Sequence, residues 1–123
     1  IESPKYRRPR PDPPRLTVGH GGCFACIYSV RGAGGYQMFG ITPMPIYDPR
    51  QETPCLRDFM CLFRPGDIVK WKPVTRAEYD HIVAEVDAGR RSPRMAPVSF
   101  SLADFHRDID GTNARVMEAL NGR

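Results

Sequence analysis

Three histidines and four cysteines are the side chains of this chain with the most reactive chemistry. His20 lies in the run Gly19-His20-Gly21-Gly22, which we expect to form a glycine-rich turn with an exposed, conformationally free imidazole. Such a group exchanges a proton near neutral pH and is a candidate acid, base or ligand contact. The alternative for His20 is a loop histidine without a chemical role. His81 and His106 are predicted to be solvated on helices, and the three histidines lack metal-ligand spacing.

Cys23 and Cys26 have the C-x-x-C spacing of zinc and redox sites. Residues 23–28 are rich in aromatic and β-branched side chains, however, and this pattern predicts a strand. Positions three apart on a strand point to opposite faces, so both sulfurs cannot reach one metal. Cys55 and Cys61 also lack a knuckle spacing. We therefore expect reduced, structural cysteines in a cytoplasmic protein, with a metal site or a disulfide as alternatives.

One glycine-rich stretch is a candidate for a phosphate-binding loop. Gly32, Gly34 and Gly35 precede a predicted strand, whereas phosphate-binding loops follow a strand and open a helix. No nucleophile elbow or Walker loop is present in the sequence either. The sequence therefore assigns no catalytic residue from a local motif.

These residues must be positioned by a small fold. The chain has 123 residues, 41% hydrophobic and 26% charged, which is typical of one globular domain. No apolar run approaches the roughly 18 residues of a membrane span, and the polar, basic N-terminus has no signal-peptide pattern. Because position 1 is isoleucine, we expect a fragment, a processed piece or the ordered part of something longer.

Residues 1–15 differ in composition from the rest. They hold five Lys or Arg residues against two Asp or Glu residues, which is +3 of the net charge of +4. Five prolines predict extended, polyproline-like chain. We expect a solvated arm over 1–15 and a folded domain over 16–123, with binding of nucleic acid by the arm as the alternative.

Periodicity predicts a mainly β domain with peripheral helices. Strands are expected over residues 16–18, 23–30, 36–41, 68–74 and 98–100. In the expected strand over 68–74, Trp71 lies between two lysines. We expect it to face the core. Thr75 and Glu78 form a capping box that opens a helix ending at Gly89. A last helix is expected from Ser101 to Leu120, with a possible interruption at residues 110–111.

Three stretches taken together resemble a known family. They are Gly19-His20-Gly21-Gly22-Cys23 with Cys26-Ile27-Tyr28, the run 32–48 that contains Gly34-Gly35-Tyr36-Gln37, and the run 62–74. Their order is similar to the second half, subdomains C and D, of the carboxyltransferase domain of urea carboxylase. It is also similar to the sporulation-kinase-inhibitor (KipI-like) proteins, known as allophanate hydrolase subunit 1 and as a subunit of 5-oxoprolinase. The similarity extends over residues 3–120.

This resemblance implies a cyclophilin-like β-barrel with one or two peripheral helices, including the C-terminal one. It also implies half of a carboxyltransferase that moves a carboxyl group from carboxybiotin to urea or a urea-like amide. The carboxybiotin comes from a partner domain, and the chain binds no cofactor directly. The implied partners are a homologous carboxyltransferase half (KipA-like) and a biotin carboxylase or biotin carrier. The alternative is a non-catalytic, KipI-like regulatory subunit, such as a kinase inhibitor or 5-oxoprolinase subunit.

The resemblance also implies a pocket. Its expected lining is Gly34, Gly35, Tyr36, Gln37 and Thr42, and His20 is added as a sixth candidate for substrate binding. Glycine amides would stabilise a developing oxyanion, and Gln37 would orient an amide. The alternative for Tyr36 and Gln37 is a structural role in a strand. The family often has Gly-Arg-Thr where this chain has Gly40-Ile41-Thr42, and isoleucine cannot supply the arginine fork.

Overall fold

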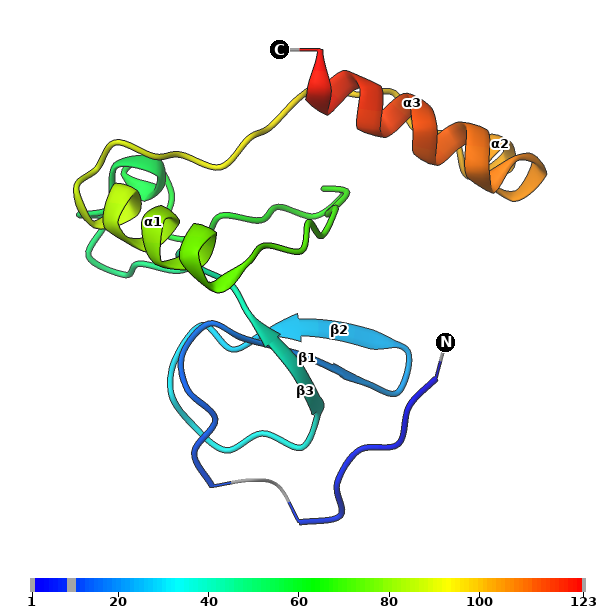
Figure 1. The fold of residues 1–123 in the computed structure, drawn as a ribbon. Helices are drawn as coiled ribbons and strands as arrows, with labels where there is room; N and C mark the ends of the chain where they lie inside the picture. The colour runs from blue at the N-terminus through cyan, green and yellow to red at the C-terminus, as the bar shows by residue number, and fades with distance from the viewer. Residues whose placement is uncertain (1, 9–10, 123) are drawn as a thin grey trace. The chain divides into compact units, whose positions relative to one another are not determined.

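The computed structural model describes residues 2–8 and 11–122, and they form two compact units, residues 1–92 and 93–123 (Figure 1). The first unit contains three strands, a 3₁₀ helix and an α-helix: β1 (Thr17–Gly21), β2 (Phe24–Ile27), β3 (Gln37–Ile41), η1 (Pro54–Leu56) and α1 (Arg76–Asp87). The second unit contains α2 (Leu102–Arg107) and α3 (Ile109–Asn121). None of the helices in the described residues is long and apolar enough to cross a membrane.

The three strands form one open antiparallel sheet in the order β2-β1-β3. β1 and β2 make a hairpin whose turn uses Gly22 at φ +61°, a left-handed conformation that favours glycine. β3 pairs with the other side of β1, and the register shifts between Val18 and Gly19. The predicted strands over 23–30 and 36–41 are therefore confirmed in shorter form. A closed barrel is not formed by the described residues and stays a prediction.

The expected turn over residues 19–22 was wrong, because Gly19 and Gly21 belong to β1. The reason is the side chain of Tyr36, which lies against Gly21 with its ring and against Gly19 with its Cβ. A Cβ added at Gly21 would lie 2.5 Å from Cδ1 of Tyr36, and one at Gly19 would lie 3.1 Å from its Cβ. Glycine within a strand often marks such a close approach. His20 is consequently a half-buried strand residue and not a free loop residue.

Two other expected strands are absent. Residues 67–75 and 98–100 have no strand assignment, and Trp71, expected in the core, is 50% exposed. Alternation of apolar and polar residues predicts a strand only where another strand supplies hydrogen-bond partners. The turn before this segment is confirmed, since the Asp67 amide donates to the Arg64 carbonyl at 3.1 Å and Gly66 has φ +94°.

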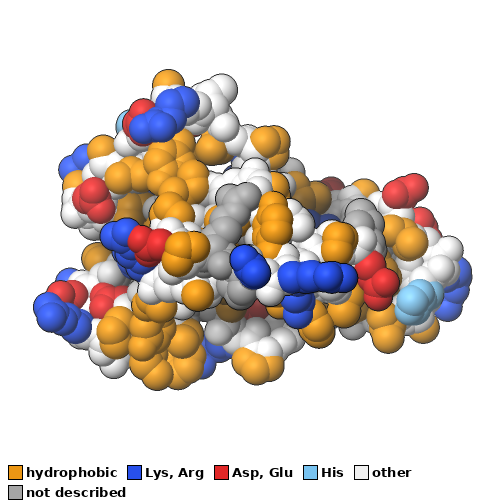
Figure 2. Space-filling view, turned by 90° about the horizontal axis from the view of Figure 1, so that it is seen from below, with side chains coloured by type: hydrophobic (Ala, Val, Ile, Leu, Met, Phe, Trp, Pro, Cys, Tyr) orange, Lys and Arg blue, Asp and Glu red, His pale blue; other side chains and the backbone are white. Residues whose placement is uncertain are grey.

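The buried core of the described residues is small. Val18 and Leu56 are the buried hydrophobic residues of the first unit, and Pro13 is also fully buried. The accessible surface is 9189 Å² for a chain of 13.9 kDa. A compact monomer of that mass exposes about 6,700 Å², and two separate bodies of these sizes about 7,800 Å². Figure 2 shows hydrophobic side chains gathered on the surface, and Phe24 and Phe39 are 62% and 65% exposed.

Helix α1 begins and ends as predicted. Thr75 and Glu78 form a reciprocal capping box, in which the Glu78 amide donates to the Thr75 hydroxyl at 3.2 Å and the Thr75 amide donates to the Glu78 carboxylate at 2.7 Å. These bonds satisfy amides that the first turn leaves without partners. The chain leaves the helix through Gly89 at φ +69°.

The second unit holds two helices where one was expected. Ser101 caps α2 by accepting from the Asp104 amide at 3.2 Å, as predicted. The interruption lies at Asp108 and not at residues 110–111, because the Asp108 carboxylate accepts from the Gly111 amide at 2.8 Å and starts α3. A side chain at Gly111 would collide with that carboxylate. Val116 is buried in this unit.

Part of the predicted arm contacts the sheet. Ser3 and Gly22 form an antiparallel bridge with two backbone hydrogen bonds, of 3.1 and 2.7 Å. The Tyr6 amide donates to the Gly35 carbonyl at 2.8 Å. Residues 3–6 are mostly exposed, as expected of a solvated arm, but two of them have backbone hydrogen-bond partners. The division at residue 15 into arm and domain stays a prediction, and residues 9 and 10 lie outside the described residues.

Candidate functional site

The first group of predicted site residues lies in the loop before β3. Gly34, Gly35 and Tyr36 line an open cavity of about 420 Å³, together with residues 26–30 and 32–33 from the end of β2 and the loop that follows. These three predicted residues are therefore brought together. Whether they bind a substrate stays a prediction.

Tyr28 shapes this cavity and was not singled out as a site residue by the sequence. A Cβ added at Gly34 would lie 2.2 Å from Oη of Tyr28 and 2.3 Å from its Cε1. The Tyr36 amide donates to the same Oη at 3.4 Å. The phenol thus occupies the space that Gly34 leaves, which explains why glycine is required there. The available signal was a tyrosine followed closely by a glycine-rich loop.

Cys26 lies at the same cavity as a half-buried free thiol. Burial raises the pKa of this thiol, and hydrogen bonds involving the Gly19 backbone and the Tyr28 side chain oppose that shift more weakly. A thiol with a raised pKa is protonated at neutral pH and is a poor nucleophile. Among the described residues, no group of three or more His, Cys, Asp or Glu residues is placed to hold a metal ion.

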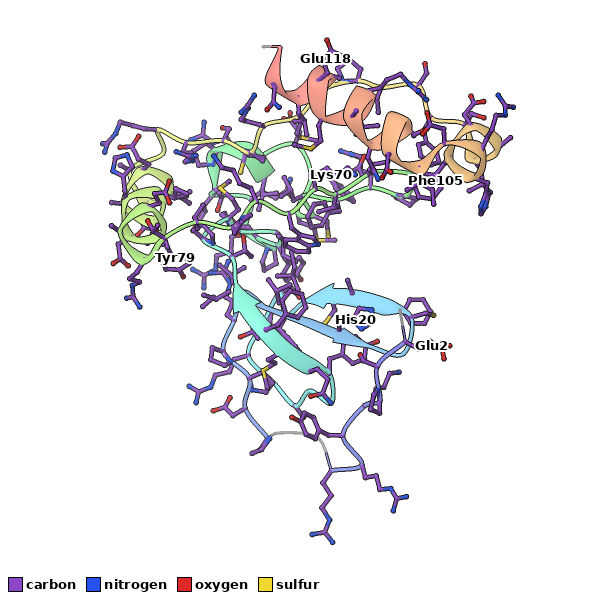
Figure 3. The ribbon with its side chains drawn as sticks, turned by 45° about the vertical axis from the view of Figure 1, so that its right-hand side comes forward. Glu2, His20, Lys70, Tyr79, Phe105 and Glu118 are labelled. Carbon is purple, nitrogen blue, oxygen red and sulfur yellow. The ribbon has the colours of Figure 1, made fainter. Side chains whose placement is uncertain are left out.

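The second group of predicted site residues lies on the sheet. His20 on β1 and Gln37 on β3 are register partners, and opposed residues of an antiparallel pair share one face with Cβ atoms about 5 Å apart. Ser3 Oγ lies 2.7 Å from Nδ1 of His20. The Gln37 side-chain amide donates to the Pro4 carbonyl at 2.8 Å. Figure 3 labels His20 on β1, with Glu2 of the N-terminal segment near the same end of the sheet.

The segment of residues 3–6, here called the strap, also contacts the first group. Lys5 places its ammonium nitrogen 5.1 Å from the ring centroid of Tyr36, within range of a cation–π interaction. Tyr6 bonds to the Gly35 carbonyl. The strap therefore contacts four of the six predicted site residues, a role that the sequence did not suggest because prolines and arginines dominate the arm.

Thr42 stands apart from both groups. Its hydroxyl accepts from the Met44 amide at 3.3 Å, and its own amide donates to the Leu16 carbonyl at 3.0 Å. The first bond is that of a local turn, and the second continues the pairing of β3 with β1 beyond Thr17 and Ile41. Ile41, at the position where the family often has arginine, ends β3 opposite Thr17 and is 50% exposed.

A second cavity, of about 580 Å³, lies between α1 and the loop that follows β3. Asp48 is part of its wall and accepts hydrogen bonds from the backbone amides of residues 50, 52 and 53 and from the Thr53 hydroxyl. The bonds from the Thr53 amide and hydroxyl are the main cause that lowers the pKa of Asp48 to about 2. Its carboxylate holds the loop through these hydrogen bonds. We therefore assign Asp48 a structural role.

Comparison with known proteins shows which family the first part of the chain is similar to. Residues 1–57, which include the sheet, both groups of site residues and the strap, match the family model of the carboxyltransferase domain, subdomain C and D. Residues 1–57 are therefore similar to subdomains C and D of the carboxyltransferase domain. The resemblance inferred from the sequence is confirmed.

The relatives of this chain are larger proteins. Urea amidolyase of Saccharomyces cerevisiae is 35% identical over 122 residues, which is 97% of this chain and 6% of the relative. A 5-oxoprolinase subunit of Bacillus subtilis is 33% identical over 79 residues, 64% of this chain and 30% of the relative. The crystal structure of TTHA0988 is 35% identical, covers 54% of this chain and 12% of that chain, and has a TM-score of 0.45. The chain thus spans less than a third of each.

Proposed function

We propose that this chain contributes to the transfer of a carboxyl group from carboxybiotin to urea or a urea-like amide. The observation that carries the proposal is the match to urea amidolyase along nearly the whole chain, joined to the family match over residues 1–57. In this reaction one nitrogen of urea loses a proton and gains the carboxyl group, giving allophanate. Because the relatives are multi-domain enzymes or subunits, the chain acts with a homologous carboxyltransferase half and with a carrier of carboxybiotin.

The chain's own residues have two tasks in this proposal. The cavity lined by Gly34, Gly35 and Tyr36 would hold a carbonyl or carboxylate oxygen, with the Tyr28 hydroxyl as a donor. Preorganised donors of this kind stabilise negative charge that develops on oxygen. On the sheet, His20 and Gln37 orient the amide. Carboxybiotin, when delivered by the partner, supplies the carboxyl group.

The proposal includes a cyclophilin-like barrel in the assembled enzyme. The sheet of the described residues is open, and side chains such as Phe39 and Phe24 are more than half exposed. Burial of such side chains stabilises by about 1.5–3 kcal/mol each, so further strands or a partner surface would cover them favourably. All four cysteines are free thiols, which fits a reducing compartment such as the cytoplasm.

A second function is favoured by the match to the 5-oxoprolinase subunit. In this alternative the chain is a regulatory or binding subunit of an assembly that acts on 5-oxoproline, or an inhibitor that docks on a kinase. The chemistry then resides in the partner, and the cavity of this chain contributes contacts only.

The test is reconstitution of the full protein with its homologous half and a biotinylated carrier. We expect urea-dependent transfer of labelled carboxyl from the carrier, and a decrease of about tenfold or more for Gln37→Leu if its amide orients the substrate. Gln51→Asn is the control, since the Gln51 side-chain amide donates to the Arg57 carbonyl, outside the sheet. Absence of urea-dependent transfer, together with 5-oxoproline-dependent turnover in the same assembly, would establish the alternative.

A further inference from the structure

The strap connects the N-terminal segment to both polar residues on the sheet. Ser3 is held by its backbone bridge to Gly22, and Tyr6 is held by its bond to Gly35. These two anchors fix the backbone on either side of Pro4. The polar groups that the strap presents between them are the Ser3 hydroxyl and the Pro4 carbonyl.

The Ser3 hydroxyl contacts both the imidazole and the backbone carbonyl of His20. A serine has one proton to donate, and Nδ1 of His20 is 2.7 Å from Oγ while the His20 carbonyl oxygen is 3.4 Å away. The shorter distance is typical of an O–H donor and its acceptor, so we assign the proton to the bond with Nδ1. A neutral imidazole that accepts at Nδ1 carries its proton on Nε2. His20 then offers a hydrogen-bond donor at Nε2.

The Pro4 carbonyl determines which end of the Gln37 side-chain amide faces the strap. A carbonyl oxygen only accepts, so the Gln37 side chain must turn its NH₂ group toward Pro4, where the distance is 2.8 Å. This fixes the amide orientation without an assumption about flipping. The Oε1 atom of Gln37 is left as the acceptor for a ligand.

We propose that Ser3 and Pro4 are positioning residues of the candidate site, which set His20 as a donor and Gln37 as an acceptor. The two residues are register partners on one face, so the pair presents one donor and one acceptor about 5 Å apart. A ureido or primary amide group has the complementary carbonyl oxygen and N–H. This inference rests on the proposed function for its ligand, but the polarity of the pair is a property of the chain alone.

The experiment measures the ring nitrogens of His20 by long-range ¹H–¹⁵N NMR at pH 8 in the full protein. We expect Nε2 of His20 to be protonated and Nδ1 to be an acceptor. Ser3→Ala should move both ring signals toward those of His81, a helix residue that serves as internal reference. Ser3→Thr keeps a hydroxyl and should preserve the wild-type signals.

A second variant tests the bond between Gln37 and Pro4. Gln37→Glu replaces a donor by a carboxylate that faces the Pro4 carbonyl, so the strap should open more often, and loss of one hydrogen bond predicts about fivefold faster tryptic cleavage after Lys5. Because the backbone bridge to Gly22 still holds Ser3, the ring signals of His20 should keep the wild-type pattern. Gln51→Glu removes a comparable bond to a backbone carbonyl elsewhere and should leave the cleavage rate unchanged.

Three results would overturn the inference: protonation of wild-type His20 at Nδ1, unchanged ring signals in Ser3→Ala, or an unchanged cleavage rate in Gln37→Glu. In Ser3→Ala, a merely structural strap would alter cleavage without altering the tautomer. If the expected ring pattern were found in a protein without urea-dependent transfer, the proposed function would fail while the polarity assignment held. The two proposals are thus separately testable.

Discussion

Substitution of Gly34 by alanine tests the packing that forms the cavity wall. The added methyl would lie 2.2 Å from Oη, 2.3 Å from Cε1 and 2.4 Å from Cζ of Tyr28. Non-bonded carbon atoms normally stay about 3.5–4.0 Å apart, so the phenol must move by more than an ångström. Its displacement also removes the hydrogen bond from the Tyr36 amide.

The magnitude follows from three contributions to the free energy of unfolding. Overpacking costs about 1–3 kcal/mol, and loss of the long hydrogen bond costs at most about 1 kcal/mol. Because Gly34 does not have a positive φ, alanine is permitted there and gains about 0.4–1 kcal/mol by restricting the unfolded chain. We expect a net loss of about 1–2 kcal/mol, which lowers the Tm by about 4–16 °C for a unit of this size.

Guanidinium and thermal denaturation, followed by circular dichroism, measure this change. Gly32→Ala is the matched control in the same loop, since an added Cβ meets nothing within 4 Å, and it should be neutral or slightly stabilising. In a Tyr28→Ala background Gly34→Ala should also be neutral, which gives a coupling energy of about 1–2 kcal/mol. An equal cost of Gly34→Ala in both backgrounds would refute the packing argument.

Three further predictions concern local structure. Asp48 has a folded pKa of about 2, below its unfolded value of about 3.9, so its stabilising contribution is present above pH 4 and is lost as the pH falls through about 2. Asp48→Asn should remove this acid dependence in a circular dichroism titration, whereas Asp58→Asn should retain it. Thr75→Ala removes the cap of α1 and should cost about 1 kcal/mol of unfolding free energy, and Thr75→Ser should restore it; equal stability of the two variants would contradict the capping role. Gly89→Ala forces alanine to φ +69° and should cost about 1–2 kcal/mol, measured against Gly40→Ala, where an added Cβ meets nothing within 4 Å.

Large aromatic side chains are exposed in the first unit, where Phe39 is 65% and Trp71 is 50% exposed. We expect such side chains to be covered when the chain is part of a larger assembly. The small share of each relative that the chain spans agrees with this interpretation.

Predictions from sequence succeeded where the determinants are local. The capping box at Thr75, the stop at Gly89 and the turn at Gly66 depend on residues within a few positions, so the sequence alone determines them. The resemblance to the family could also be recognised from the sequence, because the order of glycine-rich and aromatic runs is a property of the chain. Strand prediction failed for residues 67–75 for the opposite reason, since a strand is stable only when a partner accepts its hydrogen bonds.

The candidate site shows the same division. The sequence by itself identified Gly34, Gly35 and Tyr36 as one cluster, because adjacent residues in a loop stay together whatever the fold. Only the tertiary structure decided that His20 is a strand residue opposite Gln37, and that Ser3 reaches it from 17 positions away. The polarity of that pair depends on contacts between segments distant in the sequence, and no local pattern encodes which backbone group a folded chain brings to a given side chain.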